Sequence, residues 1–317
     1  MTLPGDALGL ALGYLLDLCF ADPRRGHPVA AFGRIAGVLE RILYRDSRMR
    51  GLWFALALVG GAAALGYGIS SQIHYSLLRL AVVAIITWIV LGGTSLIKEA
   101  SAMADTLTEN DLPAARTRLG SLCGRDAASL DPDALARATV ESVAENTSDA
   151  VVAPLFWGAL LGIPGLLAYR ALNTLDAMVG HRSERYAKFG MASAKLDDLA
   201  NLIPARLAGL LTALSAWVVG GSSIETLRVI SRDGRHHPSP NAGQVEAAFA
   251  GALGLTLGGT STYAGVVDDR PQLGRGRFVE IGDIARANRL SRAVQVSAVL
   301  VAAIVSAIVS ALIWGRS

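Results

Sequence analysis

The chain has 317 residues, of which 52% are hydrophobic and 17% are charged, whereas about 25% of the residues of an average soluble domain are charged. This composition excludes a disordered chain, which needs low hydrophobicity and high charge, and it argues against a soluble globule. The net charge is only +3 and no long basic run occurs, so nothing favours binding to nucleic acid. We therefore expect a single integral membrane domain over residues 1–317.

Charge-free stretches long enough to cross a bilayer, which takes about 20 apolar residues, occur at Leu52–Ile69, Leu80–Ile97 and Ala293–Trp314. Ala7–Phe20 is shorter and contains Asp17, and we expect a partly inserted helix there. No Lys or Arg precedes that stretch, so it is not typical of a cleaved signal peptide. The predicted fold class is all-α: a polytopic integral membrane protein with roughly four to six transmembrane helices, re-entrant or broken helices, and cytoplasmic helical loops.

Prolines and glycines interrupt three further apolar stretches: Ala150–Ala168, Leu207–Ile224 and Ala247–Val267. Broken helices at membrane depth are tolerated where protein or a wet cavity covers the freed backbone groups. Ile163–Gly165 is therefore expected either at the tip of a re-entrant hairpin or at the kink of an ordinary span. The sequence favours neither alternative.

The polar stretch Ala21–Gly51 contains seven arginines and three acidic residues. The positive-inside rule places such a stretch in the cytoplasm. Two predicted spans later, Glu99–Asp149 returns to the same face, and the basic stretch Tyr169–Arg206 is expected there too. The sequence thus predicts a multi-pass protein of the cell (inner) membrane with its active loops on the cytoplasmic face.

An acidic cluster directly precedes the apolar stretch that begins at Ala150, and it contains Glu141, Glu145, Asn146 and Asp149. The two glutamates are four residues apart, so a helix places both on one face, where like charges repel. A bound cation or an arginine would offset this repulsion, and hard oxygen ligands suit Mg²⁺. The alternative is a solvated acidic helix face.

Residues 169–186 form the densest polar cluster. Its charged and amide residues recur at helical spacing, and the later arginines extend the same stripe if the helix continues: Arg170, Asn173, Asp176, Arg182 and Arg185. Guanidinium groups bind phosphate and carboxylate with two hydrogen bonds, so the cluster suits a magnesium phosphate. The alternative is an interfacial helix with internal salt bridges.

Asp197, Asp198 and Asn201 bring carboxylate and amide oxygens together if they lie on a helix. This pattern suits a metal, and its alternative is the capped start of a helix, where aspartate is favoured.

His237 lies in a turn fixed by Pro238 and Pro240, and a histidine can carry protons near neutral pH. A purely structural histidine is an equally weighted alternative. The stretch from Asp22 to His27 forms a smaller rigid site next to the membrane. The glycine-rich stretch Gly258–Tyr263 is expected to be a turn that either cradles phosphate through backbone N–H groups or breaks a helix.

Several nucleotide and hydrolase signatures are absent from the sequence: it contains no Walker A loop, no GxGxxG after a strand and no GxSxG. A nucleotide would therefore be held by an unusual site.

Segments that follow one another over most of the chain carry a longer pattern: Asp22–Pro23, His27–Val29, Glu141–Asp149, Ala153–Trp157, Tyr169–Asp176, Arg185–Tyr186, Phe189–Gly190, Leu196–Asp198, Asn201, Pro204–Arg206 and His237–Gly243. In these segments the chain resembles the CobD/CbiB family of cobalamin biosynthesis. The resemblance implies an adenosylcobinamide-phosphate synthase, which joins the propionate carboxyl of adenosylcobyric acid to (R)-1-aminopropan-2-ol or its O-phosphate. It implies ATP as co-substrate, Mg²⁺ as cofactor and an acyl phosphate intermediate.

Side-chain chemistry divides the candidate residues among three roles. Catalytic roles are expected for Glu141, Glu145, His237 and Asp176. Binding of substrate or phosphate is expected for Arg170, Asn173, Arg182, Arg185, Tyr186, Arg206, His27 and Asn241. Metal binding is expected for Asp197, Asp198, Asn201, Asn146 and Asp149.

Two other functions remain open. The first is a membrane-embedded, Mg²⁺-dependent prenyl or phospho-alcohol transferase, and the second is a non-catalytic corrinoid-binding scaffold. Besides its substrates and the lipid bilayer, the expected partners include other late cobalamin enzymes at the membrane, and they include no nucleic acid.

Overall fold

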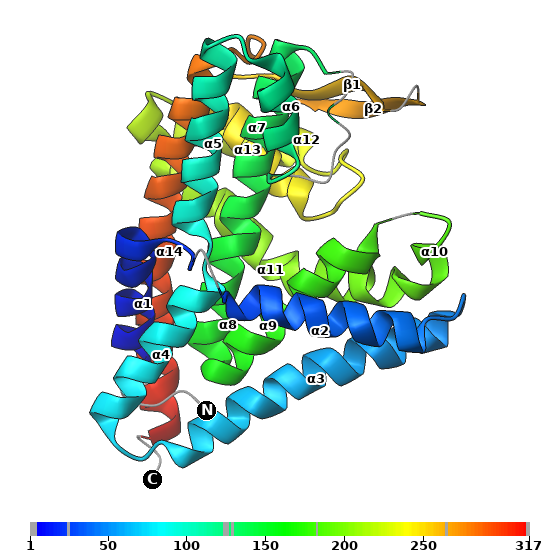
Figure 1. The fold of residues 1–317 in the computed structure, drawn as a ribbon. Coiled ribbons are helices and arrows are strands. Elements are labelled where there is room, and N and C mark those ends of the chain that lie inside the picture. The colour runs from blue at the N-terminus through cyan, green and yellow to red at the C-terminus, as the bar shows by residue number, and fades with distance from the viewer. Residues whose placement is uncertain are drawn as a thin grey trace. The chain divides into compact units, whose positions relative to one another are not determined.

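A computed structural model of the chain is almost entirely helical (Figure 1). It describes all residues except 1–4, 24–25, 123–126, 128–129, 182, 264–265 and 315–317, and it does not describe the side chains of 260–269, 313 and 314. Two compact units share the chain. Unit 1 comprises Met1–Gly92, Ala153–Asn201 and Ala298–Ser317, and unit 2 comprises Gly93–Val152 and Leu202–Ser297.

The elements of unit 1 are α1 (Asp6–Phe20), α2 (Pro28–Leu43), α3 (Arg48–Gln72), α4 (Ser76–Val90), α8 (Ala153–Leu161), α9 (Ile163–Leu175), the π-helical turn η2 (Asp176–Gly180), α10 (Tyr186–Phe189), the first part of α11 (Met191–Ser215) and the last part of α14 (Gly282–Trp314). Unit 2 holds the rest of α11 and α14 with α5 (Gly93–Thr108), α6 (Leu112–Leu119), α7 (Pro132–Thr147), the π-helical turn η1 (Ser148–Val152), the 3₁₀ turn η3 (Ala216–Val219), α12 (Ser223–Asp233), α13 (Ala242–Leu253), β1 (Leu257–Tyr263) and β2 (Val266–Leu273).

The first helix packs closely on α4. Gly9 and Gly13 allow this approach, because a Cβ at either position would overlap side chains of α4. Arg79 of α4 donates two hydrogen bonds to the Asp6 carboxylate, at 2.6 and 2.8 Å, and both side chains are buried. A buried charge is tolerated only when it is paired in this way, so the pair ties α1 to α4.

The core of unit 1 forms where α2, α3 and α9 meet the short helix α10. Its fully buried members are Ala36, Phe54, Leu175, Val179 and Phe189. The rings of Phe54 and Phe189 lie 5.1 Å apart in a tilted arrangement. This core holds α2 against α9, which carries the polar stripe predicted from the sequence.

The irregular stretch at Ala150–Ala168 is a helical hairpin. The helix α8 ends at Leu161, Gly162 turns the chain with φ +66°, and Pro164 stands in the first turn of α9, where its missing N–H is not needed. Of the two predicted alternatives, the structure has the hairpin and not the kinked span. Its depth in a bilayer stays a prediction.

Four stretches of helix are long and apolar enough to cross a membrane: Arg48–Gln72, Ser76–Thr108, Met191–Val219 and Gly282–Leu312. Two of them contain the predicted charge-free stretches Leu52–Ile69 and Leu80–Ile97, and the last overlaps all but two residues of Ala293–Trp314. The all-α, polytopic membrane fold is therefore confirmed.

The apolar stretch Leu207–Ile224 is interrupted where its glycines predicted, because Gly220 adopts a left-handed conformation with φ +74°. Its first part belongs to the candidate span Met191–Val219. The helix α11 starts at Met191, runs through Pro204 and ends at Ser215. The helix of this candidate span also carries Asp197, Asp198 and Asn201, so the helix on which the sequence brought them together is confirmed.

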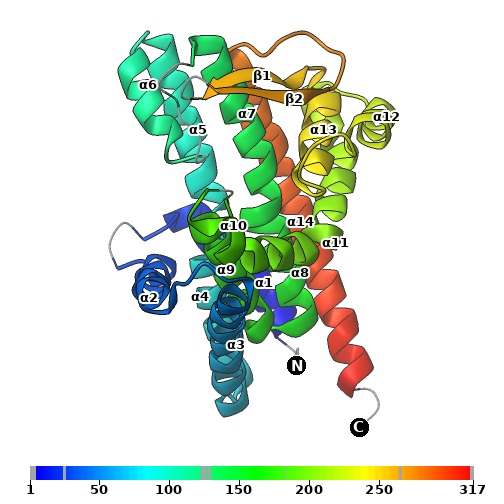
Figure 2. The ribbon, with the colours of Figure 1, turned by 90° about the vertical axis from the view of Figure 1, so that its right-hand side faces the viewer.

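The prediction of an apolar segment at Ala247–Val267 is wrong. Gly254 adopts a left-handed conformation with φ +68° and ends α13, after which β1 and β2 pair as an antiparallel hairpin. The hairpin packs against α7 and α13 (Figure 2). Gly258 and Gly259 also have positive φ, so the glycines that suggested a turn lie inside β1.

Candidate functional site

A polar pocket of about 570 Å³ opens in unit 1 between the residues preceding α2 and the polar face of α9. Its lining combines one acidic, one imidazole and two guanidinium side chains with small and apolar ones: Asp22, His27, Val29, Ala30, Gly33, Arg34, Arg170, Thr174 and Met178. Five of these residues belong to segments that the sequence singled out: Asp22, His27, Val29, Arg170 and Thr174. The pocket thus gathers groups that can bind an anion and exchange a proton.

The ring of His27 is oriented by the backbone that follows it. Its Nδ1 atom accepts a hydrogen bond from the N–H of Val29 at 3.1 Å and caps α2. Pro28 has no N–H, so Val29 supplies the first available donor. An Nδ1 atom that accepts this bond carries no proton, and the neutral ring is protonated at Nε2. That atom lies 3.8 Å from Oδ1 of Asp22.

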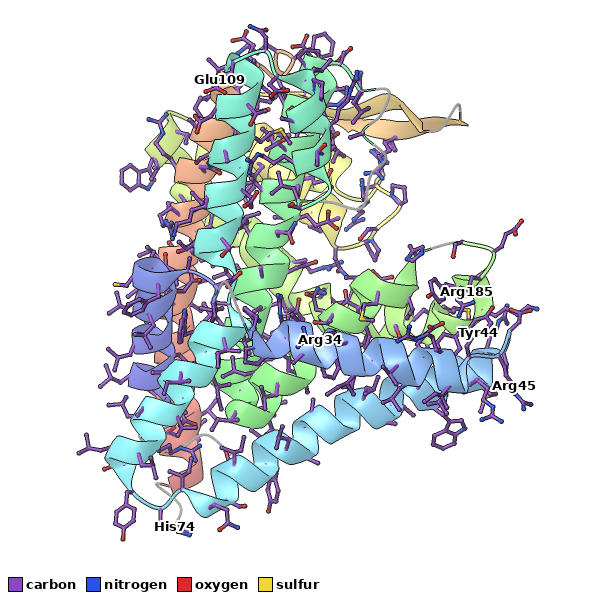
Figure 3. The ribbon with its side chains drawn as sticks, in the orientation of Figure 1. Arg34, Tyr44, Arg45, His74, Glu109 and Arg185 are labelled. Carbon is purple, nitrogen blue, oxygen red and sulfur yellow. The ribbon has the colours of Figure 1, made fainter. Side chains whose placement is uncertain are left out.

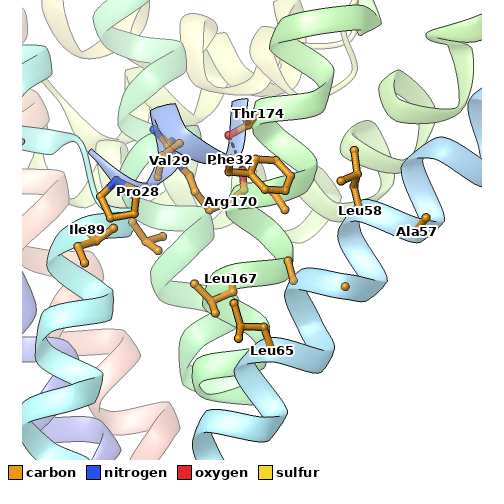
Figure 4. Close-up of a pocket in the computed structure, with 14 residues that line it drawn as sticks. Pro28, Val29, Phe32, Ala57, Leu58, Leu65, Ile89, Leu167, Arg170 and Thr174 are labelled. Carbon is orange, nitrogen blue, oxygen red and sulfur yellow. Dashed lines mark hydrogen bonds between the residues drawn. The ribbon is translucent and has the colours of Figure 1, made fainter. Parts of the chain in front are cut away.

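The side chains of α9 form the opposite wall of the pocket. Arg170 donates to the side-chain oxygen of Asn173 at 3.4 Å, which confirms that these two residues share one helix face. The hydroxyl of Thr174 donates to the carbonyl oxygen of Arg170 at 2.7 Å. Both Arg170 and Thr174 also line a second, apolar cavity of about 330 Å³ between α2, α3, α4 and α9 (Figure 4).

A buried chain of hydrogen bonds connects α9 with α11. The hydroxyl of Tyr169 donates to the side-chain oxygen of Asn201 at 2.9 Å, and the amide nitrogen of Asn201 donates to Oδ2 of Asp197 at the same distance. All three side chains are buried, so this chain fixes the rotamer of Asp197. Asp198, the next residue of α11, is half-buried.

The alternative that Asp197 and Asp198 cap the start of a helix is wrong, because α11 begins at Met191, more than one turn earlier. Asp176 opens the π-helical turn η2, where Gly180 leaves room for its carboxylate. Single π-helical turns inside helices are frequent at functional sites.

The helix does not continue from Asp176 to Arg185, because the chain leaves it at His181. The condition on which Arg185 would extend the polar stripe is therefore not met. Arg185 pairs with Glu40 at 2.8 Å and stacks over the ring of Tyr44 at 4.1 Å (Figure 3). The Glu40 carboxylate raises the pKa of the Arg185 guanidinium, as does Tyr186. Arg185 therefore faces α2 and not the stripe of α9. Arg182, for which phosphate binding was predicted, lies outside the described residues.

Unit 2 holds the acidic cluster of α7, and its two glutamates have different surroundings. Glu141 is buried, accepts a hydrogen bond from the N–H of Gly258 at 2.8 Å, and lies 3.9 Å from Nε of Arg137. Glu145 is exposed. An arginine therefore accompanies the pair, as the sequence suggested. The Gly258 N–H that was expected to cradle phosphate binds this carboxylate.

The other two members of the cluster are half-buried. The side-chain nitrogen of Asn146 donates to the carbonyl oxygen of Ser142 at 3.0 Å, and Asp149 stands in the π-helical turn η1.

His237 is anchored by the turn in which it lies. Its Nδ1 atom accepts from the N–H of Ser239 at 3.1 Å, and its Nε2 atom lies 3.8 Å from Oε1 of the buried Glu246. The Ser239 hydroxyl accepts from the N–H groups of Asn241 and Ala242 and so caps α13. The proline-rich segment thus has a structural explanation.

Arg206 and Asn241 meet in unit 2. The Arg206 side chain donates to the carbonyl oxygen of Leu202 at 2.6 Å and to the side-chain oxygen of Asn241 at 3.4 Å. Arg206 is exposed while Asn241 is buried, so the contact lies at the surface of this unit.

The predicted site residues are thus divided between the two units. Unit 1 holds His27, Arg170, Asn173, Asp176, Arg185, Tyr186, Asp197, Asp198 and Asn201, and unit 2 holds Glu141, Glu145, Asn146, Asp149, Arg206, His237 and Asn241. That both sets line one site stays a prediction.

Within the residues that the structure describes, no three His, Cys, Asp or Glu side chains gather as a metal-binding group. Mg²⁺ is commonly bound by one or two carboxylates together with substrate phosphates. Asp197, held by Asn201, and the adjacent Asp198 fit this simpler requirement.

Sequence reasoning missed Arg34 and Glu246. Arg34 is one of seven arginines in its stretch, and nothing in the spacing distinguishes it. Glu246 is the only charged residue of α13, and a single charge in an apolar helix is itself a signal of a specific role.

Comparison with known proteins gives matches over nearly the whole chain. The model of the CobD/Cbib protein family matches residues 10–291. A protein named cobalamin biosynthesis protein CobD from Mycobacterium tuberculosis (strain ATCC 25618 / H37Rv) is 50% identical over 298 residues, which cover 94% of this chain and 95% of that protein. Proteins of the same name from Geobacter metallireducens and Rhodobacter capsulatus are 47% identical over 266 residues and 40% identical over 302 residues. They cover 82% and 93% of this chain, and 84% and 95% of their own lengths. No solved structure gives a significant match.

Proposed function

Because the chain belongs to the CobD/CbiB family, we propose that it acts in cobalamin biosynthesis as an adenosylcobinamide-phosphate synthase. A relative named cobalamin biosynthesis protein CobD matches over 94% of this chain. The proposed reaction joins the propionate carboxyl of adenosylcobyric acid to (R)-1-aminopropan-2-ol or its O-phosphate. The observation that carries the proposal is the polar pocket of unit 1, which places two guanidinium groups beside an oriented imidazole.

Amide formation needs activation, because a carboxylate does not react with an amine at neutral pH. In the proposed sequence, a carboxylate oxygen attacks the γ-phosphorus of ATP, the bond to ADP breaks, and an acyl phosphate forms. The amine nitrogen then attacks the acyl carbon, the bond to phosphate breaks, and the nitrogen loses a proton. Such a reaction depends mostly on positioning and on charge stabilisation.

The pocket of unit 1 supplies groups for these tasks. Arg170 and Arg34 bind anionic oxygens, and Asn173 orients Arg170 from the same helix face. The Nε2–H of His27 donates to an anionic oxygen, because Nδ1 is occupied by the Val29 N–H. Asp22, beside that ring, accepts a proton from the amine.

The acidic residues of unit 2 complete the proposal. The exposed carboxylate of Glu145 is a second candidate for the base. Glu141 positions the hairpin through Gly258. Of the two alternatives for His237, its burial against Glu246 supports the structural one, so we place no proton transfer on it.

Asp197 and Asp198 would hold Mg²⁺ in unit 1, with Asn201 orienting Asp197. In unit 2, the proposed Mg²⁺ ligands are Asn146 and Asp149. The ion would supply positive charge that offsets the negative charge developing during phosphoryl transfer.

The proposal places the protein in the cell (inner) membrane, with the arginine-rich stretch before α3 on the cytoplasmic face. There it would meet ATP, the corrinoid and other late enzymes of the pathway. The four candidate spans support the membrane location.

One observation favours a second candidate. The apolar cavity shares Val29, Arg170 and Thr174 with the polar pocket, and this arrangement also suits a lipid diphosphate as the substrate of a membrane-embedded transferase. That enzyme would consume no ATP. A non-catalytic corrinoid-binding scaffold would bind substrate without turnover.

The test is an assay of the purified full chain in detergent with adenosylcobyric acid, Mg²⁺, ATP and the amine or its O-phosphate. We expect one ADP and one amide product per turnover, and loss of product in Arg170→Gln with unchanged stability. Arg228→Gln, an exposed arginine of α12, is the matched control. Product formation without ATP, or corrinoid binding without product, would refute the ligase.

A further inference from the structure

The segment Pro28–Arg50, called the arginine segment below, has more basic side chains than its own acids can balance. It contains five arginines and only two acidic residues. Both acids pair outside the segment, Glu40 with Arg185 at 2.8 Å and Asp46 with Lys188 at 2.6 Å. The segment therefore presents a net positive surface.

An apolar stripe runs along the same surface. Ile35, Val38 and Ile42 are 57, 47 and 71% exposed, and their spacing places them on one face of α2. Another face of α2 already packs through Ala36 into the core of unit 1. The stripe is therefore a second apolar face, and packing within unit 1 does not account for it.

The arginines flank this stripe. Arg34 and Arg41 each precede a stripe residue by one position, so they lie along one side of it, and both are exposed. Arg45 follows at the end of α2, near Tyr44 and Arg185 (Figure 3). An apolar stripe bordered by basic side chains is typical of a helix at a membrane surface.

The stripe continues into a candidate span. The first turns of α3 contain Arg48 and Arg50. They also expose Met49 and Trp53, which are 58 and 64% accessible. Arginine and tryptophan at the end of a spanning helix mark the level of the lipid headgroups. The arginine segment thus enters the span at that level.

We propose that the arginine segment is a binding surface for anionic phospholipids. Ile35, Val38 and Ile42 contact the acyl chains, while Arg41 and Arg45 bind the headgroup phosphates. An anionic lipid is the occupant because the surface combines exposed apolar side chains with excess positive charge, next to a helix that crosses the bilayer. This inference does not depend on the proposed ligase activity.

The first test measures what covers the stripe. A nitroxide label is placed at Ile42→Cys in a full chain with Cys19→Ser and Cys123→Ser, reconstituted in nanodiscs. We expect oxygen, which is lipid-soluble, to collide with the label more often than a water-soluble nickel complex does. A label at Glu109→Cys, an exposed acid, should show the reverse. Preference for nickel at position 42, or a label that neither reagent reaches because protein covers it, would overturn the proposal.

The second test measures lipid selectivity with spin-labelled phosphatidylglycerol and phosphatidylcholine. Wild type should hold more of the anionic lipid in its motionally restricted fraction, and raising the salt concentration should weaken this preference. The double variant Arg41→Gln and Arg45→Gln should lose at least about half of it. A variant with the same charge change, Arg228→Gln and Arg235→Gln, should keep it. Equal behaviour of the two variants would refute the proposed surface.

Discussion

The two histidine–proline turns use one backbone arrangement in different surroundings. In both, the Nδ1 atom of the histidine accepts the backbone N–H two residues later at 3.1 Å, and the Nε2 atom lies 3.8 Å from a carboxylate. His27 borders an open pocket with two arginines, and its partner Asp22 is 34% exposed. His237 is 8% exposed and faces Glu246, which is 2% exposed.

The comparison shows that the orientation of a histidine ring and its function depend on different parts of the structure. Proline removes one N–H, so the next one along the chain binds Nδ1, and local sequence alone orients both rings. The environment of Nε2 then decides whether this atom can contact a ligand or is enclosed in the protein interior. A further contrast is that Nδ1 of His237 also lies 3.3 Å from the carbonyl oxygen of Ser239, so it keeps a partner when protonated.

The largest expected effect is a loss of enzyme activity when His27, in the first turn, is replaced. His27→Asn keeps a side chain that can cap α2, so thermal stability should change little. Loss of the Nε2–H donor should lower kcat/KM for amide formation on the order of 10²-fold, as loss of a positioned donor typically does. Wild-type activity in this variant would show that the two turns have the same structural role.

The second prediction concerns the packing of the other turn. A Cβ at Gly243 would lie 2.5 Å from Cβ of His237 and 2.6 Å from the carbonyl oxygen of Gly234. Gly243→Ala should therefore destabilise the protein by about 2–3 kcal/mol, measured as a lower midpoint of thermal unfolding. Gly33→Ala in α2 is the control, because a Cβ there meets Met178 at an ordinary 3.8 Å. Equal stability of the two variants would contradict this account.

The third prediction compares the two carboxylates. Glu246→Leu leaves the buried Nε2 of His237 without its acidic neighbour and should cost about 1–3 kcal/mol of stability. Asp22→Leu, at a half-exposed site, should cost less stability and more activity. Chemical denaturation and the ligase assay on both variants test this reversal, and a larger stability loss in the Asp22 variant would be evidence against it.

The smallest expected effect is a pH dependence in unit 2. The Arg232 guanidinium holds the pKa of Asp233 below its ordinary value of 3.8, and the N–H of Gly274 acts in the same direction. A depressed folded-state pKa stabilises the fold above the unfolded pKa, and this contribution is lost as the pH falls through the folded value. Asp233→Asn should lose about 1 kcal/mol at neutral pH and show a weaker decline of stability below about pH 4. An unchanged acid decline would argue against it.

Several features of the fold were predictable because they depend on neighbours in the chain. The charge-free stretches locate three candidate spans, and Gly162 with Pro164 locates the hairpin turn within a residue or two. The common face of Arg170 and Asn173 follows from helical spacing. Each of these depends only on length, periodicity or backbone conformation.

Other features were not predictable, because distant segments decide them. Helical spacing brings Asp197 and Asn201 together, but it does not reveal that Tyr169 of another helix donates to Asn201. Glu141 and Glu145 are equivalent in spacing, but Glu141 is buried and accepts the N–H of Gly258, whereas Glu145 is exposed. The spacing of Arg185 suggested that it extends the phosphate-binding stripe, but in the structure it pairs with Glu40.

The sequence alone determined that this is a polytopic helical membrane protein of the CobD/CbiB family, because hydrophobic length and long ordered motifs are properties of the chain itself. The tertiary structure decided which polar side chains face a pocket, which are buried in pairs and which reach the surface. Burial and hydrogen bonding depend on segments that are remote in the sequence, so identical local patterns, such as the two histidine–proline turns, acquire different surroundings.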